Sequence, residues 1–131
     1  MIPVDNSEYS KNAIPIVIDL AKKYNSKIAV VHVMDESSVF SYDDLDENGE
    51  NLIQLILKEA EPFGIEVIDH LITGDALRDM ETIIRKSGAD LVVVPAWGND
   101  TQIRNVDKTN FIGSITERII RVSKVPVMII K

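Results

Sequence analysis

Residues 27–34 read KIAVVHVM, a run rich in apolar and β-branched side chains. Such a run is typical of a strand that is buried on both faces, and therefore of a parallel sheet. Segments at residues 1–5, 65–72, 89–94 and 125–130 predict four more strands. The predicted strands are thus spread from the first residues of the chain to the last.

Helical patterns separate these strands. Apolar residues recur at a spacing of three and four at residues 13–24, 52–60, 77–84 and 114–122. Pro15 is expected to bend or delay the first helix, and Gly88 fits the C-terminal cap of the third. The alternation predicts a Rossmann-like α/β fold, a three-layer sandwich of four helices on a five-stranded, mostly parallel sheet, in a single domain of residues 1–131.

The composition excludes several classes of protein. The 131 residues carry a net charge of −7, which argues against a broad nucleic-acid surface but permits a small nucleotide. No apolar run approaches the ~20 residues of a membrane span. No basic segment followed by an apolar one leads the chain, so we expect a cytoplasmic location without membrane contact. The absence of cysteine excludes disulfides, thiolate zinc sites and cysteine nucleophiles.

No catalytic or metal motif is recognisable. The sequences GxSxG, HExxH, GKS and GKT are absent. Residues 44–49 imitate the start of an EF-hand calcium loop, but Leu55 stands where that loop needs a glutamate. His32 and His70 are interpreted as ordinary strand histidines. We therefore expect no metal site and no catalytic residue.

In a doubly wound sheet, ligands bind where the strands end. Asp5, Val33 and the loop after Val94 all lie at the carboxyl ends of predicted strands, so we expect them to share one crevice. Asp5 could contact a ribose hydroxyl or a phosphate-bound cation, or Asp5 or Ser7 could cap the following helix, and the two roles are compatible. Trp97 in the loop is open to several interpretations: simple burial, a lid, a neighbour of adenine or a subunit contact.

Gly113 and Ser114 lie between this loop and the last predicted helix. A helix N-terminus presents unpaired N–H groups and the positive end of the helix dipole, which together hold phosphate, and glycine lets an anion approach the backbone. The sequence from Ser114 to Glu117 also matches a capping box, in which those two side chains satisfy the helix end without a ligand. Both interpretations stay open.

Four segments carry a family resemblance: IPVDNSEYS (2–10), VVHV (30–33), ITGDA (72–76) and above all GSITERIIRVSKVPVMII (113–130). In this order, and over nearly the whole chain, they resemble the universal stress protein family. The resemblance implies the strand order 3-2-1-4-5 and a homodimer that pairs the last strands, here residues 125–130. Such pairing would cover an apolar edge strand that is otherwise prone to aggregation.

The nucleotide-binding branch of that family holds ATP with the first two strand ends and a loop of glycine, two residues, glycine, nine residues and glycine-serine. ATP or another adenine nucleotide, with or without Mg²⁺, is therefore the implied cofactor. The implied contacts in this sequence are Pro3, Val4, Asp5, Val33, Val94, Gly98, Gly113, Ser114 and Ile115.

The loop departs from that pattern. Pro95 stands where the first glycine belongs, which removes one flexible position and one N–H donor. Residues 99–112, between Gly98 and Gly113, outnumber the nine residues of the motif. They include two aspartates, which would repel a triphosphate unless a divalent cation intervenes.

Two hypotheses follow. The first is a nucleotide-binding regulator of the universal stress type, dimeric and cytoplasmic, with an unidentified protein partner and at most slow ATP hydrolysis. The second is a dimerising interaction module of the same family that has lost the nucleotide. A true hydrolase is disfavoured because the sequence shows no arranged base and nucleophile.

Overall fold

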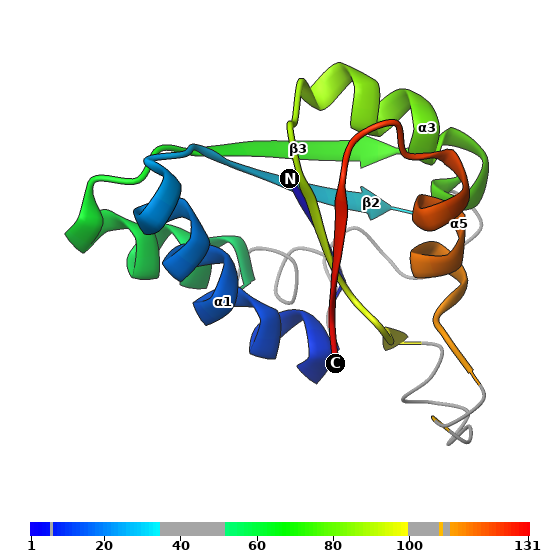
Figure 1. Ribbon diagram of the computed structural model, residues 1–131, viewed down its shortest axis with the longest axis horizontal. Helices are drawn as coiled ribbons and strands as arrows, with labels where there is room; N and C mark the ends of the chain where they lie inside the picture. The colour runs from blue at the N-terminus through cyan, green and yellow to red at the C-terminus, as the bar shows by residue number, and fades with distance from the viewer. Residues whose placement is uncertain (6, 35–51, 100–107, 109–110) are drawn as a thin grey trace.

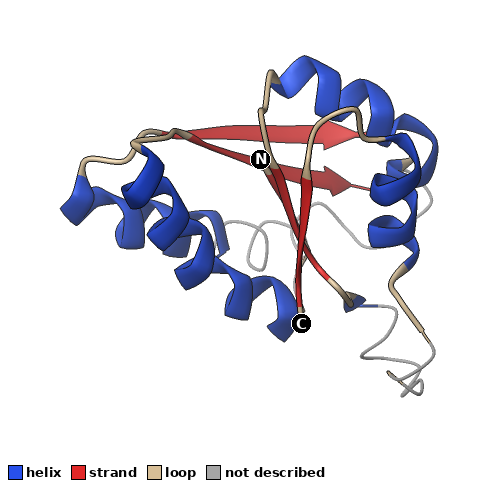
Figure 2. Ribbon diagram, viewed as in Figure 1, coloured by secondary structure: helices blue, strands red, loops and turns tan. Residues whose placement is uncertain are grey.

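The computed structural model describes residues 1–5, 7–34, 52–99, 108 and 111–131. Strands and helices alternate along these residues (Figures 1 and 2). The strands are β1 (Ile2–Val4), β2 (Ile28–Met34), β3 (Val67–Thr73), β4 (Val92–Pro95) and β5 (Val127–Ile130). The helical segments are α1 (Glu8–Tyr24), a helix at residues 52–60, the 3₁₀ turn η1 (Glu61–Phe63), α3 (Ala76–Ser87) and α5 (Ser114–Val122). The predicted α/β class and the predicted alternation are confirmed.

The strands pair in parallel throughout the described part of the chain. β2 lies between β1 and β3, with Ile2 opposite Val30, and β4 pairs with β5. The two sets meet at β1 and β4, where the backbone N of Val93 donates to Met1 O at 2.9 Å. Met1 N in turn donates to Leu91 O at 2.8 Å. The resulting order, β3-β2-β1-β4-β5, is the predicted one.

Helices cover both faces of this sheet. On one face Ile14 of α1 packs in a buried cluster with Val30. On the other, Met80 of α3 and Ile119 of α5 pack in a second cluster with Val31. Val30 and Val31 are 0% and 1% exposed, so neighbouring side chains of β2 are buried in opposite layers. Each such burial contributes about 1.5–3 kcal/mol, which explains why a run such as residues 27–34 carries apolar side chains on both faces.

Polar side chains and left-handed residues define the ends of the helices. The Asp75 side chain caps α3 by accepting from Arg78 N at 3.0 Å. At the other end of α3, Gly88 has a φ of 66°, a left-handed conformation that glycine adopts without strain. The predicted C-terminal cap at Gly88 is confirmed.

Pro15 does not delay α1, contrary to one of the two expectations for it. The helix begins at Glu8 and runs through Pro15 to Tyr24. A proline in a helix removes one hydrogen bond. Here Pro15 lies on the exposed side, while Ile14 and Val17 are buried in the core and stabilise the helix on either side of it.

Candidate functional site

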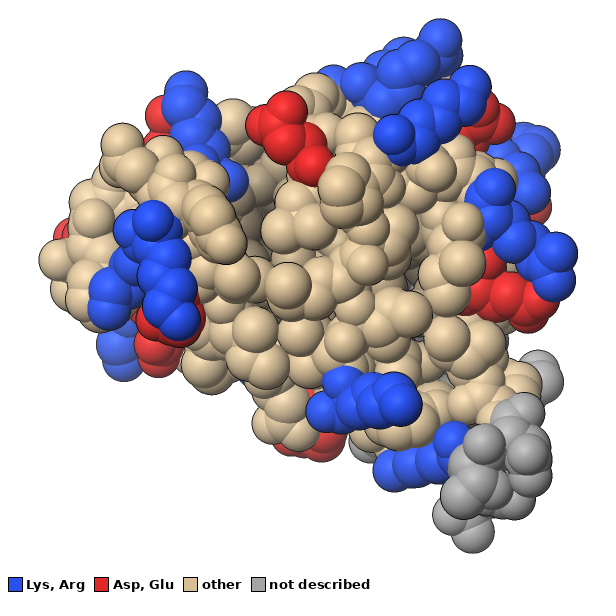
Figure 3. Space-filling view, in the orientation of Figure 1, with Lys and Arg blue, Asp and Glu red and all other residues tan. Residues whose placement is uncertain are grey.

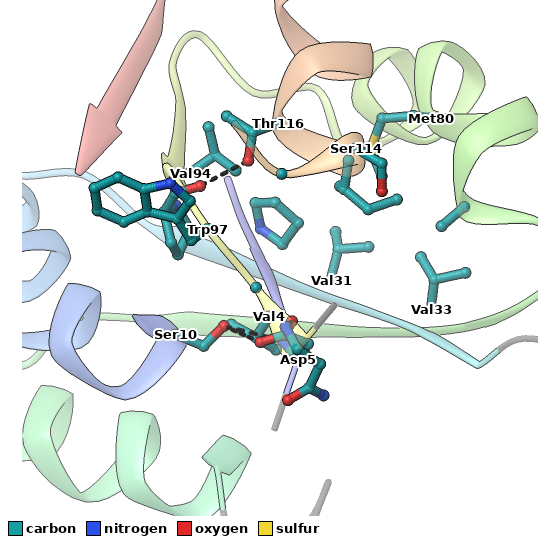
Figure 4. A pocket seen from close by; sticks show the side chains of 17 residues that line it. Val4, Asp5, Ser10, Val31, Val33, Met80, Val94, Trp97, Ser114 and Thr116 are labelled. Carbon is teal, nitrogen blue, oxygen red and sulfur yellow. Dashed lines mark hydrogen bonds between the residues drawn. The ribbon is translucent and has the colours of Figure 1, made fainter. Parts of the chain in front are cut away.

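A cavity of about 340 Å³ opens at the carboxyl ends of β1, β2 and β4, with α3 and α5 as its other walls (Figure 4). The structure brings together around this cavity every residue that the family resemblance implies as a nucleotide contact. These residues are Pro3, Val4, Asp5, Val33, Val94, Gly98, Gly113, Ser114 and Ile115. The expectation that strand ends distant in sequence share one crevice therefore agrees with the geometry.

Other lining residues were not identified from the sequence: Ser10, Val31, Ala76, Met80, Asn99 and Thr116. Some of them carried a usable signal. Val31 lies two positions before Val33, and side chains two apart in a strand share a face. Ala76 and Met80 are four apart on α3 and so share one face of that helix. Asn99 directly follows Gly98, a predicted contact, whereas Ser10 carried no signal, because a contact with Asp5 draws it to the site.

One wall of the cavity is apolar. Val31 and Val33 project from β2, and Met80, which is 1% exposed, closes the wall from α3. In Figure 4 Val31 lies between Ser114 of α5 and Asp5, the residue that follows β1, and Val33 lies beside Val31. The cavity thus has an apolar floor with polar groups on two sides, an arrangement typical of small-molecule sites.

Hydrogen bonds hold Asp5 in place. Its Oδ1 accepts from Ser7 N at 3.0 Å, from the Ser7 hydroxyl and from the Ser10 hydroxyl at 2.8 Å. Its Oδ2 accepts from Asn99 N at 2.8 Å. Ser7 in turn caps α1 by accepting from Ser10 N at 3.2 Å. Of the two roles open to Asp5, the structure shows the one in the helix-start network, and the same carboxylate lines the cavity.

Gly98 approaches this carboxylate closely. A Cβ atom at position 98 would lie 2.6 Å from Asp5 Oδ2. Any other residue here would force the carboxylate or the loop to move. Gly98 therefore has a structural reason to be glycine even without a ligand.

The capping-box prediction for Ser114 and Glu117 is wrong. Gly113 is the N-cap residue of α5, no side chain caps the helix, and Ser114 is already its first residue. Glu117 does not reach back but pairs with Arg121 at 2.7 Å. Ser114 therefore lines the cavity without serving as a helix cap.

Contacts with the end of β4 and with the residue after it set the start of α5. The backbone N of Gly113 donates to Ala96 O at 2.8 Å. The buried Thr116 hydroxyl donates to Pro95 O at 2.7 Å (Figure 4). These bonds fix where the helix begins, so tertiary contacts override the local capping signal.

Trp97 is half-buried at the edge of the cavity. Its indole Nε1 donates to Phe111 O at 2.8 Å, and its ring lies 5.7 Å from the Tyr9 ring. The ammonium of Lys108 lies 4.8 Å from the centre of the Tyr9 ring and 5.5 Å from that of Trp97. The aromatic pair therefore joins α1 to both ends of the loop that follows β4.

His32 is a buried titratable residue of β2. It lies opposite Val4 in the sheet, next to the residue that precedes Asp5. Burial lowers the pKa of its imidazole, while the negative charges of Asp5 and Asp69 oppose that shift. Its Nδ1 has no hydrogen-bond partner within the part of the chain that the structure describes.

Within the described ranges, no group of three or more His, Cys, Asp or Glu side chains could hold a metal ion. The calcium-like residues 44–49 and the two loop aspartates at 100 and 107 lie outside those ranges. None of the described helices is long and apolar enough to cross a membrane.

The family model described as "Universal stress protein family" matches residues 1–131. The chain belongs to this family. The universal stress protein MJ0531 of Methanocaldococcus jannaschii is 25% identical over 141 residues, which cover 100% of this chain and 80% of that protein. The solved structure of MJ0577 from the same organism has a TM-score of 0.76 at 26% identity, over 99% of this chain and 94% of that chain. The five parallel strands and four helices are thus the universal stress protein fold.

A more distant relative has been solved with a nucleotide. The universal stress protein from Archaeoglobus fulgidus in complex with dAMP has a TM-score of 0.72 at 18% identity, over 99% of this chain and 94% of that chain. At that identity the likeness establishes a shared fold.

Proposed function

We propose that this universal stress protein binds an adenine nucleotide and acts as a cytoplasmic regulator in the stress response, without significant catalysis. One observation carries the proposal: a single cavity at the strand ends combines an apolar floor with the uncapped start of a helix. Apolar surface accommodates a planar base, and helix N-termini bind phosphate.

The parts of a nucleotide have matching surfaces in the cavity. Val31, Val33 and Met80 form apolar surface against which a purine would be buried. The start of α5 offers backbone N–H groups and the Ser114 hydroxyl to a phosphate. The dAMP complex of the Archaeoglobus fulgidus relative supports an adenine nucleotide as the ligand class.

ATP or another adenine nucleotide is the proposed ligand, with Mg²⁺ as a companion of the phosphates. Asp5 is the only carboxylate among the described residues that line the cavity. Its oxygens already accept hydrogen bonds from Ser7, Ser10 and Asn99. A magnesium ion would therefore be bound chiefly by the nucleotide, which is common for this ion.

We further propose a homodimer through β5. β5 pairs with β4 along one edge, and Met128 and Ile129 are each 37% exposed. Figure 3 shows the face over β4 and β5 as largely uncharged, with lysine, arginine and acidic side chains gathered around its margin. Pairing of two β5 strands would bury this apolar edge. Light scattering after gel filtration tests the proposed dimer. A monomeric wild type would contradict it, and so would a dimer that persists in the Ile129→Lys variant.

Isothermal titration of the full chain with ATP, ADP and AMP, each with and without Mg²⁺, tests nucleotide binding. Saturable heat and a rise in melting temperature are expected. Val33→Asp, which places a charge on the apolar floor, should abolish binding, whereas Ile16→Asp on exposed helical surface away from the cavity should not. The absence of both heat and a thermal shift at millimolar nucleotide would overturn the proposal.

The second candidate is a dimerising interaction module that has lost the nucleotide. Two observations favour it: Pro95 occupies the cavity wall where it offers no N–H, and the Asp5 carboxylate is engaged by the protein itself. Mass spectrometry of small molecules that co-purify with the protein distinguishes the two candidates. A bound adenine nucleotide in that extract would exclude the second.

A further inference from the structure

Two contacts attach one wall of the cavity, residues 97–99, to the start of α1. In the first, Asn99 N donates to Asp5 Oδ2 at 2.8 Å, within the hydrogen-bond network that closes that helix start. In the second, the ring of Trp97 lies 5.7 Å from the ring of Tyr9, the second residue of α1. The position of this wall therefore depends on both contacts.

A cation completes the second contact. The Lys108 ammonium lies 4.8 Å from the centre of the Tyr9 ring and 5.5 Å from that of the Trp97 ring. Both distances are within the separation of about 6 Å at which a cation is attracted to the face of an aromatic ring. One ammonium is therefore attracted to both rings, which favours the arrangement in which the two rings stay together.

A hydrogen bond orients the Trp97 ring in this arrangement. Its indole Nε1 donates to Phe111 O at 2.8 Å, and the side chain is half-buried. In Figure 4 the ring lies on the side of the cavity away from Val33 and Met80, which belong to the apolar floor. The ring is thus placed to fix the backbone of residues 97–99 rather than to extend the floor.

Gly98 makes the cavity sensitive to the position of this wall. A Cβ at this residue would lie 2.6 Å from Asp5 Oδ2, so the wall packs closely against a carboxylate that itself lines the cavity. Because Gly98 and Asn99 directly follow Trp97 in the chain, a displacement of the Trp97 ring is passed to both of their contacts with Asp5.

We infer that Lys108 and Tyr9 are positioning residues of the ligand cavity, which act through Trp97. The inference rests on the proposed function and adds to it two residues outside the cavity lining. The Lys108 ammonium holds the Trp97 ring against Tyr9, and Trp97 fixes the wall of residues 97–99 beside Asp5. Ligand affinity therefore depends on a charge that does not touch the ligand.

Titration calorimetry of the full chain with adenosine and with AMP tests this role. Lys108 is exposed, so Lys108→Met removes the charge and leaves the core intact. It should weaken the binding of both ligands by the same factor, about two- to fivefold, which corresponds to one exposed cation–π contact. Lys108→Arg keeps a cation for the rings and should bind as the wild type does. Unchanged affinity in Lys108→Met would overturn the inference. A loss for AMP alone would also overturn it, because Lys108 would then attract the phosphate directly.

Lys11→Met is the matched control for the loss of a positive charge. Lys11 also lies near the start of α1, but its ammonium pairs with Glu8 at 2.7 Å. The affinity for adenosine should stay at the wild-type value in this variant. An equal loss of adenosine affinity in Lys11→Met and Lys108→Met would overturn the inference, because net charge would then explain both.

A double-mutant cycle tests the contact between the two positioning residues. Tyr9→Phe keeps the ring and should bind adenosine as the wild type does, whereas Tyr9→Leu removes the ring and should bind it more weakly. In the Tyr9→Leu background, Lys108→Met should cause a smaller loss than it causes alone. Fully additive losses would mean that the two residues act independently, which would overturn the inference.

The indole N–H of Trp97 provides a measurement that needs no ligand. Trp97 is the only tryptophan, so this group gives a single resonance in NMR spectra of the full chain. Its exchange with water should be faster in Lys108→Met than in the wild type, and unchanged in Lys108→Arg. Equal exchange in Lys108→Met and the wild type would overturn the inference whether or not a ligand binds. If the wild type binds neither adenosine nor AMP at millimolar concentration, the proposed function itself fails.

Discussion

α1 and α5 begin at the same edge of the sheet, yet their first turns are completed differently. The start of α1 is closed by the protein: Ser7 caps it, and Asp5 accepts hydrogen bonds from both Ser7 and Ser10. The start of α5 has Gly113 as its N-cap residue and no side-chain cap. Both starts border the same cavity, since Ser10 and Ser114 line it.

This difference separates stability from binding. Closing a helix start with its own side chains stabilises the fold, typically by about 0.5–2 kcal/mol per cap. Leaving a start open keeps its N–H groups available for an anion. We therefore expect substitutions at the α1 side to change mainly the free energy of unfolding, and substitutions at the α5 side to change mainly ligand affinity.

Asp5→Ala should have the largest effect. It removes the acceptor for Ser7, Ser10 and Asn99 and leaves their donors without a partner. The free energy of unfolding should fall by roughly 2–4 kcal/mol, since each hydrogen bond to a charged group contributes about 1.5–3 kcal/mol. Urea denaturation measures it. Asp5→Asn keeps an acceptor oxygen and should therefore lose less free energy of unfolding. Equal losses in the two variants would show that accepting these hydrogen bonds is not how Asp5 stabilises the fold.

Gly98→Ala should come second. The new Cβ would lie 2.6 Å from Asp5 Oδ2, so the carboxylate or the loop must shift, at a cost of about 1–3 kcal/mol. The double variant with Asp5→Ala sharpens the test, because removing the carboxylate removes the clash. In urea denaturation, the double variant should lose less free energy of unfolding than the two single variants lose together. Full additivity would mean that the two residues do not interact.

Gly113→Ser would make α5 resemble α1. A Cβ at this position meets Ala96 O at 3.4 Å, an ordinary contact, and the new hydroxyl can cap the helix. Stability should stay within a few tenths of a kcal/mol of wild type or rise slightly. AMP affinity should fall about tenfold, because the cap takes an N–H group from the ligand. Gly113→Ala, which adds the Cβ without the hydroxyl, is the matched control for titration calorimetry, and equal losses in both variants would contradict the capping explanation.

His32→Leu should have the smallest effect, and it changes how the free energy of unfolding depends on pH. Burial holds the pKa of His32 below its ordinary value of 6.5, so below pH 6.5 the unfolded chain takes up the proton more readily. The free energy of unfolding of the wild type should therefore decrease as the pH falls through and below 6.5. The variant should decrease less steeply over the same range in thermal melts, and parallel curves would exclude a contribution from His32.

The fold could be predicted because its signals are local. The apolar runs marked the strands, and Gly88 marked a helix end that requires a left-handed residue. The expectation that Pro15 delays the first helix was wrong, because the helix begins at Glu8 and buried neighbours of Pro15 stabilise that turn. Strand boundaries also shifted slightly, with β5 beginning at Val127 rather than at residue 125.

The site could be predicted from the sequence only in part. Its residues could be carried over from the family resemblance, and they do surround one cavity. The hydrogen-bond partners of each residue could not be predicted in this way. The sequence from Ser114 to Glu117 has the local form of a capping box. The bonds from Gly113 and Thr116 to the carbonyl groups at residues 95–96 determine where the helix begins. Likewise, nothing near Asp5 in the sequence indicated that Asn99 donates to it.

Trp97 is the only tryptophan of the chain, and it is at once a lining residue of the cavity and a partner of Tyr9 and Phe111. Its fluorescence therefore comes from a single known place. A change in tryptophan emission on adding a ligand would report a change in the surroundings of Trp97, at the edge of this cavity, with no label attached. The protein carries its own optical sensor of occupancy.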